Sequence, residues 1–377
     1  MTKALNVGIM GMGFIGRVYV NAYHAIPLCF PNPVVTAAMS ALLRSHGGTD
    51  GFVQSAGFGL VTTSLEEFFS VPLDLVDLCT PNYLHQAEAL AAIERGIPVY
   101  CEKPMARTLE EARTMAQAAE KKGVLTHTAF VLRYLPAIRQ IKALLEAGEL
   151  GEIFNFRGHM FHSSYLDRGR PMSWRLRMAE SGGGVFADLG AHLVDIVCYL
   201  LGDVRTVRAD SRTFIKERPV AKGNPRLENV DVDDWMACTL ELNSGVIGQI
   251  EVTRMAAGAG EETTLEIFGS KGAVSFHVTQ PDSVRYFDLK RGQWIQGSLQ
   301  APPPAGERPL ETIFPSAKFS QGMMTNVHLA SVYDFLQCLV EGRPSAMDFK
   351  SGLAVQEILE AAYWSAGHSG DKLTLPL

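Results

Sequence analysis

Residues 5–16 read LNVGIMGMGFIG, and this stretch decides the fold of the first part of the chain. The apolar run from Leu5 to Met10 predicts a buried β-strand, and glycines follow it at positions 11, 13 and 16. A G-x-G-x-x-G turn between a strand and a helix is typical of a site that holds a pyrophosphate at the helix N-terminus. We therefore expect a dinucleotide to contact Gly11, Gly13, Phe14, Ile15 and Gly16.

Short apolar strands alternate with helical patterns through the first third of the chain. Further strands are expected at 34–39, 60–62, 75–79, 99–101 and 124–130, with helices at 14–23, 64–70, 85–94 and 108–122. This alternation predicts βαβ units and a doubly wound parallel sheet with helices on both faces. After about residue 131, longer alternating segments separated by glycine-containing turns predict an antiparallel meander.

The predicted fold is therefore α/β, with a Rossmann-type dinucleotide-binding domain over residues 1–131. Residues 132–377 are expected to form an α+β domain that binds substrate. The C-terminal helix, at about 353–365, is expected to pack back on the first domain.

Composition excludes several classes of function. The 377 residues include 34 basic and 40 acidic side chains, whereas a general nucleic-acid binder needs a basic face. No stretch is expected to be apolar for long enough to span a bilayer, and glycines interrupt the apolar N-terminus. Six scattered cysteines without a C-x-x-C pair are typical of a reducing compartment. We expect a cytoplasmic protein without nucleic-acid or membrane partners.

The second predicted strand lacks the acidic residue that binds the ribose of NAD, usually about twenty residues past the glycines. No Asp or Glu precedes Asp50. The strand is expected to end at Met39–Ser40, and Arg44 follows. Ser40 and Arg44 are expected to bind a 2′-phosphate, which favours NADP over NAD. The alternative is that Arg44 is a solvated loop residue and that the cofactor is NAD.

Polar residues follow the fourth and fifth predicted strands. Thr80, Pro81 and Asn82 come after one strand, with His85 beyond them, and Glu102-Lys103-Pro104 comes after the next. Ligands of open α/β sheets bind at the carboxyl ends of the strands. Lys103 is therefore expected to point into a site.

A third cluster, GGGVFADLGAH, occupies residues 182–192. Asp188 and His192 are four residues apart, on one face of a predicted helix. Taken alone, Asp188 reads as a helix cap and His192 as a core histidine. Beside a cofactor domain, His192 becomes a candidate base, because a secondary alcohol must lose a proton as it loses a hydride.

Together these segments resemble the Gfo/Idh/MocA family of oxidoreductases, from residue 4 to about 365. The matching pieces are GMGFIG, TPNYLH, EKP, GGG-x-x-x-D-x-G-x-H and GSKGAV. The resemblance implies a Rossmann domain and a second domain with an open, mostly antiparallel sheet. It implies NAD(P)-dependent oxidation of a hydroxyl on a sugar, inositol or related polyol, and homodimers or homotetramers formed through that sheet.

The resemblance also implies roles for individual residues. Lys103, Asp188 and His192 are the implied catalytic set, in which His192 takes the hydroxyl proton and Lys103 hydrogen-bonds the same oxygen. Residues implied to line the cofactor, besides the glycine-rich turn, are Thr80, Pro81, Asn82, His85 and Glu102.

Other residues have weaker patterns. Aromatic faces and arginine suit a sugar site, so substrate contacts are expected from Tyr134, Tyr165, Trp174 and Arg175, with packing or surface roles as the alternative. His159 and His162 are three apart in an alternating strand and face opposite sides, so no metal site is expected. The acidic run VDVDD at 230–234 is expected to be a solvated strand start.

Two other functions fit parts of the pattern. One is an NAD-dependent glycoside hydrolase, which oxidises its sugar transiently and shows no net cofactor turnover. The other is a non-catalytic dinucleotide-binding regulator, which would have no need of the set Lys103, Asp188 and His192.

Overall fold

The computed structural model describes residues 2–46, 50–297, 304 and 306–377. The chain divides into two compact units. Unit 1 comprises Met1–Tyr134 with Pro309–Leu353, and unit 2 comprises Leu135–Arg308 with Ala354–Leu377.

Unit 1 is built on a parallel sheet. Its strands are β1 (Lys3–Met10), β2 (Val35–Leu43), β3 (Leu60–Thr62), β4 (Leu75–Leu78), β5 (Val99–Cys101) and β6 (Thr126–Thr128). Within the described residues their order is β3-β2-β1-β4-β5-β6. The order reverses between β1 and β4, and this switch point is where nucleotides bind in doubly wound sheets. The predicted doubly wound sheet is confirmed.

Helices cover both faces of this sheet. They are α1 (Phe14–Cys29), α2 (Gly51–Ala56), α3 (Leu65–Phe68), α4 (Asn82–Glu94), α5 (Leu109–Lys122), α9 (Met323–Glu341) and the short turns η1 (Val131–Tyr134), η4 (Leu310–Thr312) and η5 (Ala317–Phe319). Helix α5 begins where predicted, because Thr108 accepts a hydrogen bond from the Glu111 N–H. It ends at Gly123, whose φ of +64° suits glycine.

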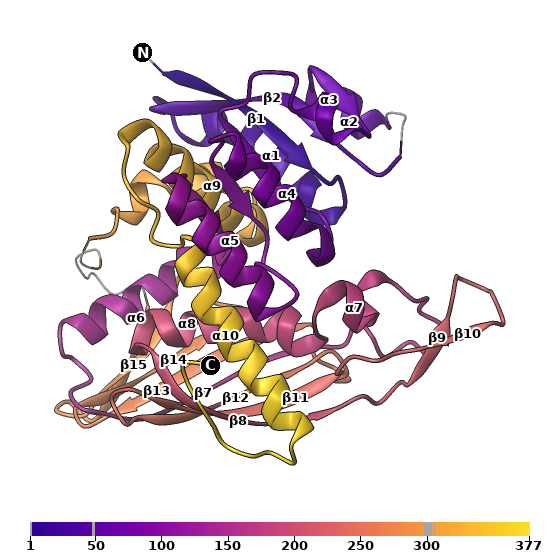
Figure 1. Cartoon of the computed structure of the whole chain (residues 1–377). Helices are drawn as coiled ribbons and strands as arrows, with labels where there is room; N and C mark the ends of the chain where they lie inside the picture. The colour runs from indigo at the N-terminus through magenta and orange to yellow at the C-terminus, as the bar shows by residue number, and fades with distance from the viewer. Residues whose placement is uncertain (1, 47–49, 298–303, 305) are drawn as a thin grey trace. The chain divides into compact units, whose positions relative to one another are not determined.

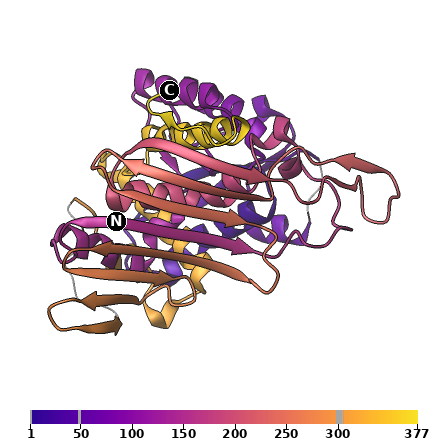
Figure 2. The ribbon, with the colours of Figure 1, turned by 90° about the horizontal axis from the view of Figure 1, so that it is seen from below.

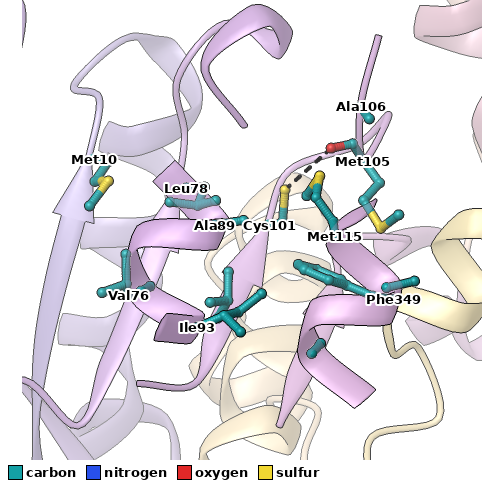
Figure 3. Close-up of a cluster of buried hydrophobic side chains, with 14 of the residues drawn as sticks. Met10, Val76, Leu78, Ala89, Ile93, Cys101, Met105, Ala106, Met115 and Phe349 are labelled. Atoms are coloured by element: carbon teal, nitrogen blue, oxygen red, sulfur yellow. Dashed lines mark hydrogen bonds between the residues drawn. The ribbon is translucent and has the colours of Figure 1, made fainter. Parts of the chain in front are cut away.

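One face of the sheet is apolar. Val76 and Leu78 of β4 and Cys101 of β5 lie against Ile93 of α4 and Met115 of α5 (Figure 3). On the other face, α9 packs on α1.

The boundary between the units differs from the prediction, in which residues 132–377 form one domain. Residues 309–353 belong to unit 1, because α9 packs its apolar side chains on α1. Helix α10 (Phe349–Gly367) starts in unit 1, where Phe349 joins the apolar cluster. From Ala354 onward α10 belongs to unit 2.

Unit 2 contains a mixed, mostly antiparallel sheet (Figure 2). Its strands are β7 (Ile153–His162), β8 (Val204–Arg212), β11 (Trp235–Leu242), β12 (Ile247–Thr253), β13 (Glu261–Gly269), β14 (Gly272–His277), β15 (Val284–Asp288), β16 (Gln293–Gly297) and β17 (Leu373–Thr374). In the part of the chain that is described, the order is β16-β15-β14-β13-β7-β12-β11-β8-β17. The first strand, β7, is thus inserted between β13 and β12 and runs parallel to β12, so the sheet is not a simple meander.

Helices line one face of the unit 2 sheet. The helical segments of this unit are α6 (Pro136–Glu146), η2 (Trp174–Leu176), α7 (Met178–Ser181), η3 (Phe186–Gly190), α8 (Ala191–Leu201) and most of α10 (Figure 1). Strand β11 alternates buried and half-buried positions, as a strand with one covered face must. A separate hairpin of β9 (Glu217–Pro219) and β10 (Leu227–Asn229) extends away from the sheet.

Contrary to the prediction, one described segment, Met178–Leu201, is long and apolar enough to cross a membrane by length and composition. Of its apolar window, 67% is buried in the structure. The core helix of a soluble protein passes the same test, so the segment is weak support for a membrane span.

Candidate active site

The glycine-rich turn leaves the N-terminus of α1 accessible to a ligand. Gly11 has φ +93°, and a Cβ at this position would lie 2.8 Å from the Cys79 carbonyl oxygen. A Cβ at Gly16 would collide with the Gly11 carbonyl oxygen, whereas one at Gly13 would meet nothing within 4 Å. The first turn of α1 carries no acidic residue, and Phe14 at its start is exposed. This turn therefore fits a pyrophosphate, which needs free backbone N–H groups and no repelling carboxylate.

The carboxyl end of β2 lies further along the chain than predicted. The strand continues to Leu43, because Ala41, Leu42 and Leu43 stay paired with β1. Ser40 therefore lies inside the strand, where its hydroxyl donates to the Asn6 side-chain oxygen at 3.1 Å. Its predicted place at the end of the strand is wrong.

Arg44 directly follows β2, at the position where NAD-binding domains usually place an acidic residue. Its N–H donates to Thr62 O at 3.1 Å. The first acidic residue, Asp50, caps α2 through the Val53 N–H at 3.0 Å and pairs with Arg17 at 2.8 Å. The Val53 hydrogen bond, with the charges of Arg17 and Arg44, lowers the pKa of Asp50. A positive charge thus occupies the end of β2, and Asp50 lies within reach of its field.

The segment after β4 turns directly into α4, with Pro81 as the cap and Asn82 as the first helical residue. Thr80 donates its hydroxyl to the Glu88 carboxylate, and burial raises the pKa of Glu88 to about 7. His85 is fully buried, with Nε2 2.9 Å from Thr80 O and Nδ1 3.3 Å from Met105 O. His85 therefore ties the loop after β4 to the loop after β5, a supporting position and not an exposed lining position.

Glu102 and Lys103 follow β5 and differ in their surroundings. The Glu102 carboxylate is turned into the core, where it accepts hydrogen bonds from the Tyr19 hydroxyl at 2.6 Å and the Lys103 N–H at 3.1 Å. Lys103 is half-buried at the carboxyl edge of the sheet. The prediction places both residues at one ligand site. Of the two side chains, Glu102 is buried and Lys103 is partly exposed.

Sequence reasoning missed His328, which comes from α9. Its Nδ1 lies 2.7 Å from Met324 O, and its ring packs edge-on against Tyr19 at 5.2 Å. Burial, and to a smaller degree the charge of Lys103, lowers the pKa of His328 to about 4. A neutral imidazole therefore lies within the field of Lys103. No motif marks this histidine, since it stands in an ordinary helical pattern far along the chain.

In unit 2, the three glycines at 182–184 pack against two buried side chains. Asp233 accepts hydrogen bonds from the N–H groups of Gly184 at 2.8 Å and Phe186 at 2.9 Å. The Tyr363 hydroxyl donates to Asp233 at 2.9 Å and accepts from the N–H groups of Gly184 and Ala187. A Cβ at Gly184 would collide with the Asp233 backbone. The glycines are therefore needed for close backbone approach.

The predicted solvated start of a strand at 230–234 is wrong. Asp233 and Asp234 are buried, with 5% and 0% of their surface exposed. Asp234 accepts from the N–H groups of Phe214 and Ile215, as Asp233 does from the glycine segment. Their charges satisfy backbone donors that the sequence pattern does not reveal.

Asp188 and His192 lie on the helix that Asp233 and Tyr363 support. The segment Phe186–Gly190 is a π-helical turn, which α8 continues. Such turns are rare and frequently occur at functional sites. Both side chains are half-buried. They belong to unit 2, whereas Lys103 belongs to unit 1.

Two of the predicted substrate residues are buried. Tyr134 is fully buried, and its hydroxyl donates to Asp334 at 2.9 Å. Tyr165 is 7% exposed, and the guanidinium groups of Arg170, Arg218 and Arg254 lie 4.0–5.7 Å from its ring centroid. Neither aromatic ring offers an open face for a sugar.

The other two predicted substrate residues are accessible. Trp174 is half-buried in η2, and the exposed Arg175 stacks its guanidinium 4.3 Å from the Trp174 ring centroid. This cation–π contact holds the Arg175 guanidinium against the Trp174 ring.

The H-x-x-H pair lies on β7, where His159 Nε2 is 3.0 Å from the Glu262 carboxylate. Over the described ranges, no group of three or more His, Cys, Asp or Glu side chains is arranged to hold a metal ion.

Comparisons with known proteins place both units in one family. A model described as the GFO/IDH/MocA C-terminal domain matches residues 138–275, and one described as an oxidoreductase family with an NAD-binding Rossmann fold matches residues 5–130. Unit 1 is thus an NAD-binding domain of an oxidoreductase family. The chain belongs to the Gfo/Idh/MocA family.

Several similar proteins act on sugars, according to their names. Levoglucosan dehydrogenase of Pseudarthrobacter phenanthrenivorans is 30% identical over 392 residues, covering 96% of each chain. Glucose-6-phosphate 3-dehydrogenase of Bacillus subtilis is 28% identical, covering 75% of this chain and 77% of its own length. A solved structure of levoglucosan dehydrogenase with NADH and L-sorbose is similar with a TM-score of 0.90, at 29% identity, and covers 99% of both chains.

Proposed function

We propose that this protein is an NAD(P)-dependent dehydrogenase that transfers a hydride between its cofactor and a secondary hydroxyl, or the matching ketone, of a sugar, inositol or related polyol. The observation that carries the proposal is the position of Lys103, half-buried at the carboxyl edge of an NAD-binding sheet. The names of the related sugar and inositol dehydrogenases support the substrate class.

The proposed roles follow from residue chemistry. The bound nicotinamide supplies the hydride acceptor in the oxidation direction. His192 takes the hydroxyl proton as general base, and Lys103 donates a hydrogen bond to the same oxygen and stabilises its negative charge. Asp188, four residues before His192, orients or tunes this pair.

Trp174 and Arg175 are the proposed substrate contacts. Trp174 presents a partly open aromatic ring and Arg175 an exposed guanidinium, which suit the C–H face and the hydroxyls of a sugar. Tyr134 and Tyr165 are buried and serve this site at most by supporting other residues.

We propose NADP as the preferred cofactor, with Arg44 as the ligand of its 2′-phosphate. The support is the arginine directly after β2, with no acidic residue before Asp50. A charge-assisted hydrogen bond is worth about 1.5–3 kcal/mol. NAD is the alternative, since the similar levoglucosan dehydrogenase was solved with NADH.

We further propose that copies of the chain associate into homodimers or homotetramers through the outer face of the unit 2 sheet. That face carries paired polar groups such as Trp235 and Glu251, joined at 2.7 Å. We also propose a cytoplasmic location, which the six cysteines support, since each is a thiol and not half of a disulfide.

The test is absorbance at 340 nm with NAD or NADP across polyols, monosaccharides, anhydrosugars and glycosides. A substrate-dependent rise with a polyol or sugar supports the dehydrogenase. Cleavage of a glycoside without a rise would overturn the proposal in favour of the hydrolase. Dinucleotide binding with neither reaction across the panel would overturn it in favour of the regulator.

A further inference from the structure

The two faces of the unit 1 sheet differ in polarity. One transverse row, formed by Asp77 of β4, Tyr100 of β5 and His127 of β6, points away from the apolar cluster shown in Figure 3. All three side chains are at most 1% exposed. Polar groups are costly to bury unless they are hydrogen-bonded, so this row requires an explanation.

Hydrogen bonds connect this row to the carboxylate beside Lys103. The Tyr19 hydroxyl of α1 donates to Glu102 Oε1 at 2.6 Å. The Tyr100 hydroxyl donates to the Tyr19 oxygen at 3.3 Å. Glu102, Tyr19 and Tyr100 thus form the first half of a buried chain.

The second half continues to the far side of unit 1. The Ser331 hydroxyl of α9 is 2.7 Å from the Tyr100 hydroxyl and 3.1 Å from His127 Nε2. His127 Nδ1 is 2.8 Å from the Ser345 hydroxyl. Ser345 lies between the exposed residues Pro344 and Ala346, so the chain ends just beneath the surface.

One assignment of hydrogens satisfies every link. An ionised carboxylate only accepts, so Tyr19 donates to Glu102 and must accept from Tyr100. Ser331 then donates to Tyr100, and His127 donates from Nε2 to Ser331. His127 Nδ1 accepts from Ser345. The chain is therefore continuous and ordered in one direction.

We propose that this chain is a proton path between Lys103 and solvent at Ser345, through which the proton released by alcohol oxidation leaves the protein. The inference rests on the proposed dehydrogenase function and adds to it Glu102, Tyr19, Tyr100, Ser331, His127 and Ser345. These six residues are buried, and in the proposed path they act through Lys103.

In oxidation, the substrate C–H bond breaks and its hydride, with both electrons, goes to the nicotinamide. His192 takes the proton that the substrate hydroxyl loses and passes it to Lys103, which in turn passes one of its own protons to Glu102. In the resting chain every hydrogen points toward Glu102, so the hydroxyl groups first rotate and His127 first moves its proton to Nδ1. Each member then passes its own hydrogen outward, from Glu102 toward Ser345, and Ser345 releases one proton to water. The chain ends with as many protons as it began with, in the arrangement that the structure shows.

The protonation behaviour of the members is consistent with this path. Burial raises the pKa of Glu102, against the lowering effects of Lys103, Tyr19 and His85, so this carboxylate holds a proton more readily than usual. Burial lowers the pKa of His127 to about 3, so the ring stays neutral and passes a proton by exchanging tautomers. Nearby Asp77 has its pKa raised by burial to about 8.

The experiment breaks the chain at its first link with Tyr19→Phe. Tyr23→Phe is the matched control, since Tyr23 lies one turn further on α1, is equally buried and donates to Asp77 at 3.1 Å, outside the chain. Stopped-flow absorbance at 340 nm follows the reduced cofactor, and a pH indicator in weak buffer follows the released proton. Reduced-cofactor affinity is measured for each protein.

In the wild type and in Tyr23→Phe, we expect the proton to appear together with the reduced cofactor. In Tyr19→Phe, its release should lag by at least about tenfold, with cofactor affinity unchanged. Ser331→Ala, a smaller change that removes two links, should show the same lag and keeps the test available if Tyr19→Phe does not fold.

Proton release in step with cofactor reduction in these chain variants would overturn the path while leaving the dehydrogenase intact. Failure of the wild type to reduce either cofactor with any polyol or sugar would overturn the dehydrogenase, and the path with it.

Discussion

At the residue scale, Lys103 and Glu102 are neighbours in sequence with opposite environments. Glu102 is held in the core by the Tyr19 hydroxyl and the Lys103 N–H. Lys103 stays at the edge of the sheet, near the neutral ring of His328. A neutral histidine does not repel the lysine charge, and the buried carboxylate balances it.

Arg44 gives the sharpest prediction at this scale. Because Arg44→Ala removes the proposed 2′-phosphate ligand, the ratio of kcat/KM for NADP to that for NAD should fall about ten- to a hundredfold. Arg17→Ala is the matched control, since Arg17 pairs with Asp50 on the surface and should leave the ratio nearly unchanged. Steady-state kinetics with both cofactors give the ratio, and an unchanged value for Arg44→Ala would contradict the assignment.

At the element scale, the π-helical turn at Phe186–Gly190 depends on contacts from distant parts of unit 2. Asp233 precedes β11 and Tyr363 belongs to α10, yet both bind the backbone at the start of the turn. Burial raises the pKa of Asp233, against the charge of Arg254 and the hydrogen bonds that it accepts. These contacts fix the backbone that carries Asp188 and His192.

Tyr363→Phe tests this support. The variant leaves the buried N–H groups of Gly184 and Ala187 with fewer acceptors, at a cost of about 1–3 kcal/mol for a buried group left unsatisfied. We expect kcat to fall by up to about a hundredfold, because small displacements of a base are costly. The dissociation constant of the reduced cofactor should not change, since the glycine-rich turn belongs to unit 1.

The control for that variant is Tyr286→Phe. Tyr286 is a buried tyrosine of the same unit, and among the described residues its hydroxyl donates to the Glu149 carbonyl alone, at 3.4 Å. The Tyr286→Phe variant should keep the kcat of the wild type. If Tyr363→Phe lowers the melting temperature but keeps its kcat, the side chain stabilises the fold without positioning the turn.

At the scale of the whole molecule, the sequence predicted the elements that local signals define. β5 and α5 lie where expected, because a short apolar run, a Thr108 cap and a Gly123 stop are all local. The end of β2 was misplaced, because Ala41 to Leu43 carry no local signal that separates a continuing strand from a loop. The placement of residues 309–353 in unit 1 depends on long-range packing, which periodicity does not encode. The position of β7 between β13 and β12 in the unit 2 sheet depends on long-range pairing for the same reason.

The candidate site shows the same division. Motifs in the sequence indicate the glycine-rich turn, Lys103 and the Asp188–His192 pair, and their roles at the site stay predictions. The inward turn of Glu102, the burial of Asp233 and the presence of His328 could not, because each depends on a hydrogen bond or packing partner from a distant segment. The supporting residues of a site therefore emerge only from the structure.

The central claim is that Lys103 and His192 carry out the chemistry, while other residues of unit 1 bind the cofactor. The most direct measurement is the turnover of Lys103→Ala and His192→Ala on a substrate found in the 340 nm panel, together with reduced-cofactor binding by fluorescence. Each variant should lose about 10²–10⁴ in kcat with cofactor affinity retained. Near-normal turnover in both variants would contradict the account.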